Sequence, residues 1–189
     1  MPENTTATSR PDPRNPFVLD VRDLGRRPGA MRDLSRRVPS PGRLGLELIG
    51  VPDGAPLDLD LKLESVTEGV LVTGTVTAPL SGECARCLDP LTDEFTGEIC
   101  ELFAYPDSAT DETTEQDEVY RIVGELIDVE PVVRETVVMG LPMSPVCRTD
   151  CPGLCPDCGG KLAELPADHA HEQIDPRWAA LAALRERPE

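Results

Sequence analysis

The chain of 189 residues has few aromatic side chains, with one Trp, two Tyr and three Phe. Aliphatic side chains must therefore supply most of a hydrophobic core, for which the 39% of hydrophobic residues is sufficient. No run approaches the roughly 18 apolar residues that span a bilayer. The polar start, Met1–Arg10, lacks the apolar segment of a secretory signal. We therefore expect a cytoplasmic protein without a membrane partner.

Sequence signatures of enzymes are also missing. The chain contains no phosphate-binding GxxxxGK[ST] loop, no dinucleotide-binding GxGxxG, no GxSxG nucleophile elbow and no HExxH. Its only two histidines, His169 and His171, lie in a Cys-rich tail, so no Ser–His or Cys–His catalytic set is apparent. We expect a non-catalytic protein without a small-molecule substrate.

Positive charge is scarce overall and unevenly distributed. The chain has 35 acidic and 18 basic residues, a formal net charge of −17. Affinity for nucleic acid comes mainly from Lys and Arg, so most of the surface should repel RNA. Residues 1–50, however, carry nine Arg against six acids, a net charge of +3 that leaves −20 for the remainder. The N-terminal part could thus contact RNA, whereas the acidic body suits a basic protein partner.

The basic N-terminal part divides into three segments. Residues 1–16 contain four prolines and predict a disordered leader. Phe17–Leu24 predicts a short strand, and residues 25–43 predict an irregular basic loop, with one or two helical turns at Met31–Arg37. The arginines of this loop either contact RNA or neutralise the protein's own acidic body. The candidate RNA contacts are Arg26, Arg27, Arg32, Arg36 and Arg37.

Period-two alternation marks the centre of a β-rich domain over residues 17–145. Leu57–Glu64 alternates apolar and charged residues and predicts a half-buried strand. After a turn at Glu68-Gly69, the β-branched segment Val70–Thr77 completes a hairpin. Leu91–Phe103 predicts a third strand. We expect an α+β protein built on an antiparallel meander or partly open barrel with one solvated face.

An acidic loop and two helices complete the expected organisation. Residues 107–118 hold six acids and predict a solvated loop, the alternative being a decoy surface for a basic partner. Val129–Met139 has apolar residues at helical spacing and predicts a short helix, although its β-branched content also fits a strand. In the tail, residues 146–189, Asp175 and Pro176 are typical of the N-cap and N1 positions of a terminal helix.

The Cys-rich tail contains a zinc-knuckle motif, Cys155-Pro-Asp-Cys158, followed by two glycines. Two thiolates at i and i+3 can bind one ion, and the glycine permits the tight turn. Zn²⁺ takes four ligands, and a closed set of S and N donors makes a structural site. The second pair could be Cys147 and Cys151 or the two histidines, and two ions with shared or incomplete shells are the alternative. We expect four of six donors to bind structural zinc: Cys147, Cys151, Cys155, Cys158, His169 and His171.

A second cysteine pair, Cys84-x-x-Cys87, lies far from the tail. Seven cysteines in a chain without an export signal favour reduced thiols over a disulfide framework. The pair lacks the βαβ context of a thioredoxin-like redox motif. It could be half of a second zinc site, completed by Cys147 and Cys151, or two small core residues. Cys100 stands alone and predicts a core residue.

Four motifs occur in order along the chain: Cys-x-Arg-Cys-Leu at 84–88, Leu-Pro-Met-x-Pro at 141–145, the Cys cluster at 147–159 and Asp-Pro-Arg-Trp at 175–178. Together these motifs resemble the YceD family, the large ribosomal RNA subunit accumulation proteins of bacteria. The resemblance covers roughly residues 17–185. It implies a non-catalytic role in large-subunit ribosomal RNA accumulation and in assembly of that subunit. Large-subunit ribosomal RNA, a pre-ribosomal particle or a basic ribosomal protein are the implied partners.

The resemblance also bears on the ligands and on the mode of action. Family members often have Cys-x-Cys where this chain has His169-Ala-His171, which favours the set Cys155, Cys158, His169 and His171. The leading hypothesis is an assembly factor whose Arg segment contacts RNA while its acidic body holds a basic ribosomal protein. The alternatives are a protein-only adaptor or chaperone for a basic, zinc-binding ribosomal protein and a thiol-redox enzyme built on Cys84 and Cys87.

Overall fold

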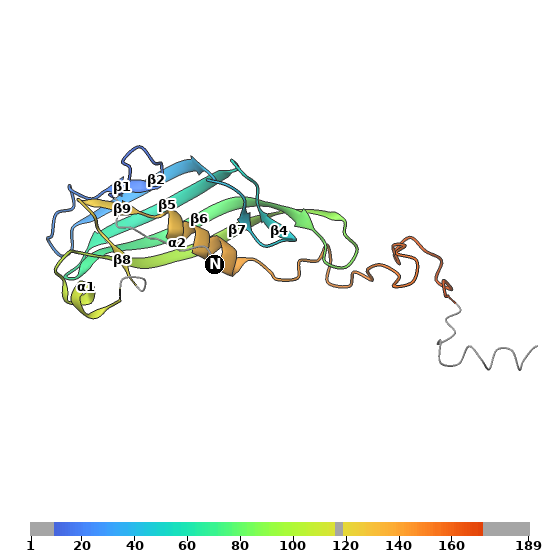
Figure 1. The fold of residues 1–189 in the computed structure, drawn as a ribbon. Helices are drawn as coiled ribbons and strands as arrows, with labels where there is room; N and C mark the ends of the chain where they lie inside the picture. The colour runs from blue at the N-terminus through green and yellow to red at the C-terminus, as the bar shows by residue number, and fades with distance from the viewer. Residues whose placement is uncertain (1–9, 116–118, 172–189) are drawn as a thin grey trace, which may run out of the picture.

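The protein is built around one strongly curved antiparallel sheet (Figure 1). This computed structural model describes residues 10–115 and 119–171. The predicted terminal helix from Asp175 and residues 1–9 of the predicted leader lie outside the described residues. The sheet contains β2 (Met31–Pro39), β3 (Leu44–Gly45), β4 (Ile49–Val51), β5 (Pro56–Ser65), β6 (Gly69–Glu83), β7 (Pro90–Ala104) and β8 (Tyr120–Arg121).

The three long strands form the predicted antiparallel meander. Strand β6 pairs with β5 along its first half, with β4 near its end and with β7 along its whole length. Strand β2 pairs with β5 at one edge, and β8 lies parallel to β7 at the other. A separate two-stranded sheet joins β1 (Val18–Asp20) to β9 (Leu126–Asp128). The predicted meander and the short strand within Phe17–Leu24 are confirmed.

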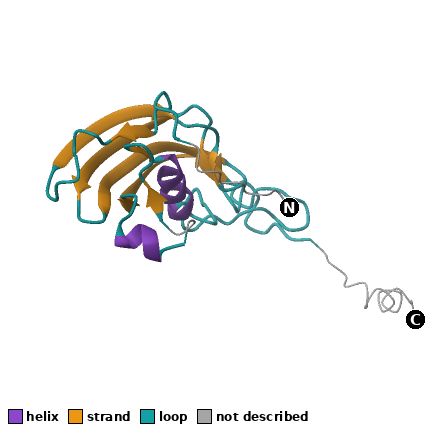
Figure 2. Ribbon diagram, turned by 60° about the vertical axis from the view of Figure 1, so that its left-hand side comes forward, coloured by secondary structure: helices purple, strands orange, loops and turns teal. Residues whose placement is uncertain are grey.

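The core lies on the concave side of the sheet, as the alternation in β5 predicts. Leu57, Leu59, Leu61 and Leu63 are at most 3% exposed, whereas the residues between them face the solvated convex side. Helix α2 (Glu130–Gly140) packs on β7 from the concave side and buries three valines, Val132, Val133 and Val137 (Figure 2). The helix predicted over Val129–Met139 is therefore confirmed.

The prediction of an irregular loop over residues 25–43 is wrong, because Met31–Pro39 is a strand. It pairs with β5 over nine positions, from Met31 opposite Glu64 to Pro39 opposite Pro56. Only Leu34 and Val38 join Arg32 and Arg36 on its inner face, so the segment lacks an apolar period. The pairing partner stabilises this strand, and charged residues are common on a sheet edge.

Two further loop predictions need correction. The acidic segment 107–118 contains a short helix, α1 (Ala109–Thr113), whose N-cap Ser108 accepts a hydrogen bond from the backbone N–H of Asp111. Residues 10–16 form an ordered turn instead of a disordered leader, because Asp12 accepts hydrogen bonds from the backbone N–H groups of Arg14 and Asn15. In both segments a short polar side chain holds a turn that composition alone does not indicate.

Candidate metal centres

Four cysteine thiols from two distant parts of the chain meet at the end of the β6–β7 hairpin. Cys84 and Cys87 lie in the turn after β6, and Cys147 and Cys151 follow helix α2. The Cys84 and Cys151 sulfurs are 3.8 Å apart, and the Cys87 and Cys147 sulfurs are 3.7 Å apart. All four sulfurs lie within 4.8 Å of one another, and none forms a disulfide. We call this cluster centre 1.

A second cluster of four donors lies further along the same tail. Cys155, Cys158, His169 and His171 place their donor atoms within 4.8 Å of one another. The Cys158 sulfur is 3.6 Å from Nε2 of His169, and the two Nε2 atoms are 2.9 Å apart. We call this cluster centre 2.

The spacing and chemistry of both clusters fit a tetrahedral metal ion. Four sulfurs about 2.3 Å from a central Zn²⁺ have mutual distances of about 3.8 Å, the spacing of the sulfur pairs in centre 1. A sulfur and an imidazole nitrogen around the same ion are about 3.6 Å apart, as in centre 2. Each cluster supplies four S or N donors, so each could hold one metal ion with a closed shell.

The backbone prepares the first cysteine of each pair as a thiolate. Burial alone would raise the pKa of the Cys84 thiol, but backbone N–H groups of Cys87, Arg86 and Cys147 lower it to about 6. In centre 2, the backbone N–H groups of Cys158 and Asp157 lower the pKa of Cys155. Thiolate is the form that binds metal, so the turn geometry favours ligation before any ion arrives.

The two Cys-x-x-Cys pairs form the same turn. The N–H of Leu88 donates to the carbonyl of Cys84 and the N–H of Gly159 to that of Cys155, each at 2.9 Å. One bond further, the N–H of each first cysteine donates to the carbonyl five residues later at 2.8 Å. The residue after each second cysteine has a left-handed backbone, with φ +60° at Leu88 and +70° at Gly159. Both pairs are thus zinc-knuckle turns.

Side chains and one backbone N–H group of the hairpin turn attach the tail to the sheet. The Arg86 guanidinium donates to the carbonyl of Cys151 at 3.0 Å. Asp89 forms an ion pair with Lys161, which lies between Cys158 and His169 in the sequence. The N–H of Ala85 donates to the carbonyl of Pro145 at 2.7 Å. These contacts, in addition to the ligands, hold both centres in one metal-binding knob, which we define as residues 83–90 and 145–171.

The structure groups the candidate ligands into two sites: the favoured tail set forms centre 2, and the second site considered at Cys84 and Cys87 forms centre 1. It assigns Cys147 and Cys151 to Cys84 and Cys87, and both histidines to the knuckle at Cys155 and Cys158. The sequence left the second pairing open beside a core interpretation, because the two cysteine pairs lie 60 or more residues apart. The expectation that Cys100 is a core residue is wrong, because its position on β7 faces the solvated side and the residue is exposed.

The arginines proposed as RNA contacts do not form one continuous free surface. Arg32 pairs with Asp23 and Arg37 with Asp58, which fits the alternative of internal neutralisation. Arg36 donates to the backbone carbonyl of Pro16. The remaining two, Arg26 and Arg27, have no acidic partner among the described residues.

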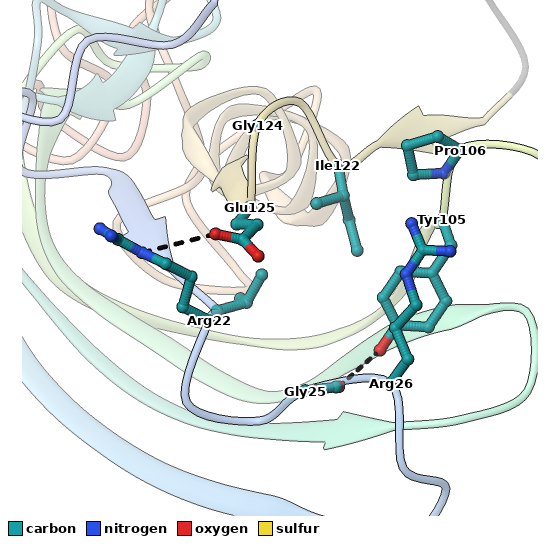
Figure 3. Close-up of a pocket in the computed structure, with 9 residues that line it drawn as sticks. Arg22, Gly25, Arg26, Tyr105, Pro106, Ile122, Gly124 and Glu125 are labelled. Carbon is teal, nitrogen blue, oxygen red and sulfur yellow. Dashed lines mark hydrogen bonds and ion pairs between the residues drawn. The ribbon is translucent and has the colours of Figure 1, made fainter.

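Arg26 lies beside a small cavity of about 200 Å³. Its guanidinium lies 4.9 Å from the centre of the Tyr105 ring, and the Tyr105 hydroxyl donates to the carbonyl of Gly25 (Figure 3). Arg22, on the other side of the cavity, is paired with Asp20 and Glu125. Sequence reasoning found Arg26 but had no signal for Tyr105, which reaches the cavity from the end of β7.

These observations define a class: a small acidic protein with a curved antiparallel sheet and a Cys-rich knob that carries two candidate structural metal centres. No helix in the described ranges is long and apolar enough to cross a membrane. The chain belongs to the YceD family, since the model described as "Large ribosomal RNA subunit accumulation protein YceD" matches residues 72–185. This match confirms the resemblance found in the motifs and spans all eight metal-ligand candidates.

Relatives in other bacteria extend the similarity over most of the chain. The uncharacterized protein Rv2926c of Mycobacterium tuberculosis is 61% identical over 90% of this chain and 82% of its own length. The uncharacterized protein ML1660 of Mycobacterium leprae is 50% identical over 90% of this chain and 78% of its own. The uncharacterized protein YlbN of Bacillus subtilis is 29% identical over 66% of this chain and 69% of its own length. No solved structure matches the chain.

Proposed function

We propose that this protein is a non-catalytic cytoplasmic factor that supports large-subunit ribosomal RNA accumulation and assembly of the large ribosomal subunit. The observation that carries the proposal is the YceD match, which spans most of β6, all of β7, helix α2 and the whole metal-binding knob. The family's printed description supplies the process, and the geometry supplies the means by which a protein without catalytic motifs could take part in it.

Zinc in both centres is part of the proposal. Thiolate and imidazole donors in tetrahedral sets of four are the ligands that structural zinc prefers. A closed shell leaves no position for water or substrate, which supports a scaffold role over catalysis and over a thiol-redox activity at Cys84 and Cys87. The ion would fix the tail against the hairpin turn.

Contact with ribosomal RNA would come from the arginines without an acidic partner. Arg26 and Arg27 are exposed near the N-terminal edge of the sheet. Arg36 donates a hydrogen bond to the backbone carbonyl of Pro16, and this contact does not neutralise its positive charge. A planar guanidinium over an aromatic ring, as at Arg26, is also a surface on which an unpaired base can stack.

The alternative is a protein-only adaptor or chaperone for a basic, zinc-binding ribosomal protein, and the convex face of the sheet favours it. Six carboxylates face the solvent there against two cations, Arg37 and Lys62, both of which are already paired with acids of this face. Such a face would repel RNA and attract a basic protein. The outward acids are Asp33, Asp58, Asp60, Glu64, Glu94 and Glu98.

Ribonuclease treatment separates these two modes. The tagged protein is purified from cells with its partners, with and without nuclease, and ribosomes of depleted cells are fractionated in parallel. Depletion should lower large-subunit ribosomal RNA relative to small-subunit RNA; an unchanged ratio would contradict the proposed function. A partner set that survives nuclease supports the adaptor, whereas its loss supports RNA contact.

A filter-binding series tests the arginines directly. The double variant Arg26→Ala, Arg27→Ala should weaken binding to large-subunit RNA and lower the salt slope by about two, one for each lost phosphate contact. Arg37→Ala is the matched control, because its charge is already paired with Asp58 and should matter little. An unchanged affinity and slope in the double variant would show that this segment does not contact RNA.

A further inference from the structure

The two zinc-knuckle turns share one left-handed backbone position but differ in the residue that occupies it. The residue after the second cysteine has φ near +60° to +70° in both, and it is Gly159 in centre 2 but Leu88 in centre 1. A left-handed backbone costs an L-residue free energy that glycine does not lose, because the Cβ approaches the carbonyl oxygen. The sequence therefore keeps a large side chain where glycine would stabilise the turn.

Leu88 gains little burial in return for this strain. Its side chain is 54% exposed and lies outside the small core of centre 1, where Leu91 packs against Cys84, Cys87 and Cys151. An apolar residue that is both strained and exposed contributes little to folding. Retained strain of this kind is typical of a position that serves binding.

A second exposed apolar residue flanks the same centre. Val146 is 36% exposed and precedes Cys147, whose sulfur lies 3.7 Å from that of Cys87. Leu88 directly follows Cys87, so Leu88 and Val146 are each next in sequence to a ligand of centre 1. We call Leu88 and Val146 the apolar patch.

The surroundings of the apolar patch are strongly acidic. Residues 83–94 and 146–171 contain eight acids and three bases. All three bases are engaged: Arg86 by the carbonyl of Cys151, Arg148 by Asp150 and Lys161 by Asp89. Two Zn²⁺ ions would not offset the six thiolates that bind them. RNA would be repelled here, and the chain's own segment 172–189, with four acids and three bases, offers no complementary charge.

We propose that the apolar patch is the docking point for a basic protein of the large ribosomal subunit, which packs apolar side chains against Leu88 and Val146. This inference rests on the proposed function and names the surface that meets the protein partner. Apolar contact at the centre with a charged rim is the usual arrangement of a specific interface. The metal in centre 1 would fix the patch, because both of its residues neighbour ligands.

The variant Leu88→Gly tests the proposal, because folding and docking should respond in opposite directions. Each protein of the large subunit is purified singly, labelled and titrated against the metal-loaded chain, with fluorescence anisotropy as the readout. We expect a positively charged protein to bind, and Leu88→Gly to weaken that binding about tenfold or more. The melting temperature should stay the same or rise, and the metal content should not change.

Met31→Ser is the matched control. Met31 is 57% exposed, close to the value for Leu88. It pairs with Glu64 of β5, which pairs with Leu71 near the start of β6. Met31 is therefore on the order of 40 Å, measured along β6, from the knuckle at the end of that strand. The Met31→Ser variant should bind the same basic protein as tightly as the unchanged chain. Val146→Ser should weaken binding in the direction of Leu88→Gly.

Four results would overturn the proposal. Unchanged binding by Leu88→Gly would show that the patch is not the docking point, and a lower melting temperature or a lost metal ion would show that Leu88 serves the fold. Trp178 is the chain's single Trp. A red shift of its fluorescence emission in the Leu88→Gly variant would show that segment 172–189 covers Leu88. If no basic protein binds but the chain still restores large-subunit RNA in depleted cells, only the docking proposal fails.

Discussion

At the scale of single residues, a metal-ligand candidate differs from an ordinary cysteine by its neighbours. Cys84 is buried and receives backbone N–H groups, and the other thiols of centre 1 lie within 4.8 Å. Cys100 has the same chemistry but stands exposed on β7, in neither cluster. The turn around the sulfur, rather than the thiol itself, therefore decides which cysteines can bind metal.

This contrast predicts the metal content of single variants. Elemental analysis of protein purified without chelator should give about two zinc ions per chain, one for each closed set of four donors. Cys87→Ser and Cys158→Ser should each lower this to about one, because a site with three donors holds zinc weakly. Cys100→Ser is the control and should keep both ions. One ion in the unchanged chain, or a loss in the control, would contradict the assignment.

At the scale of elements, the β6–β7 hairpin positions both the core and centre 1. The hairpin carries Val72 and Val76 toward the concave core, and its turn holds Cys84 and Cys87. Helix α2 packs on β7 and ends at Gly140, from which the chain continues to Cys147. The sheet therefore fixes where the two halves of centre 1 meet.

Strand β6 contains a glycine that its neighbours require. Gly74 lies opposite Leu61 and Ile99 with φ +145°, and a Cβ there would collide with the carbonyl oxygen of Asp60. Gly74→Ala should lower the free energy of unfolding by about 2 kcal/mol or more, measured by urea denaturation.

The control for this variant is Gly54→Ala. Gly54 also has a positive φ, +69°, but a Cβ there would meet no atom within 4 Å. The free energy of unfolding of Gly54→Ala should fall by about 1 kcal/mol, because only the backbone conformation is strained there. Equal losses at the two positions would show that the close approach at Gly74 is relieved without cost.

At the scale of the whole molecule, two parts depend on different forces. The sheet, α2 and the β1–β9 pair share one aliphatic core, whereas the metal-binding knob buries a separate small cluster around centre 1. Burial of apolar area stabilises the first part, and metal ligation would stabilise the second. Long-lived order in the knob should thus depend on the ions.

Metal removal should release the knob and leave the sheet intact. After chelation, the far-UV circular dichroism of the strands should persist, while trypsin should cleave at Arg148 and Lys161 far faster than in the metal-loaded protein. Cleavage at Arg134, which lies in α2 and pairs with Glu130, provides the comparison within the same chain. Cleavage at Arg134 that rises equally, or a tail that stays protected, would contradict this separation.

The sequence by itself determined the elements whose pattern is local. Alternating leucines in β5 predicted a strand with one buried face, and helical spacing predicted α2, because each pattern repeats within a few residues. The tail motif predicted a knuckle at Cys155 and Cys158, since ligand spacing and the following glycine are also local.

Only the tertiary structure decided which distant residues meet. It made a strand of Met31–Pro39 through pairing with β5, and it joined Cys84 and Cys87 to Cys147 and Cys151. It also left Leu88 exposed on a left-handed backbone. Composition and spacing carry no record of these contacts, because the free energy of pairing, ligation and burial depends on neighbours that lie far away in the chain.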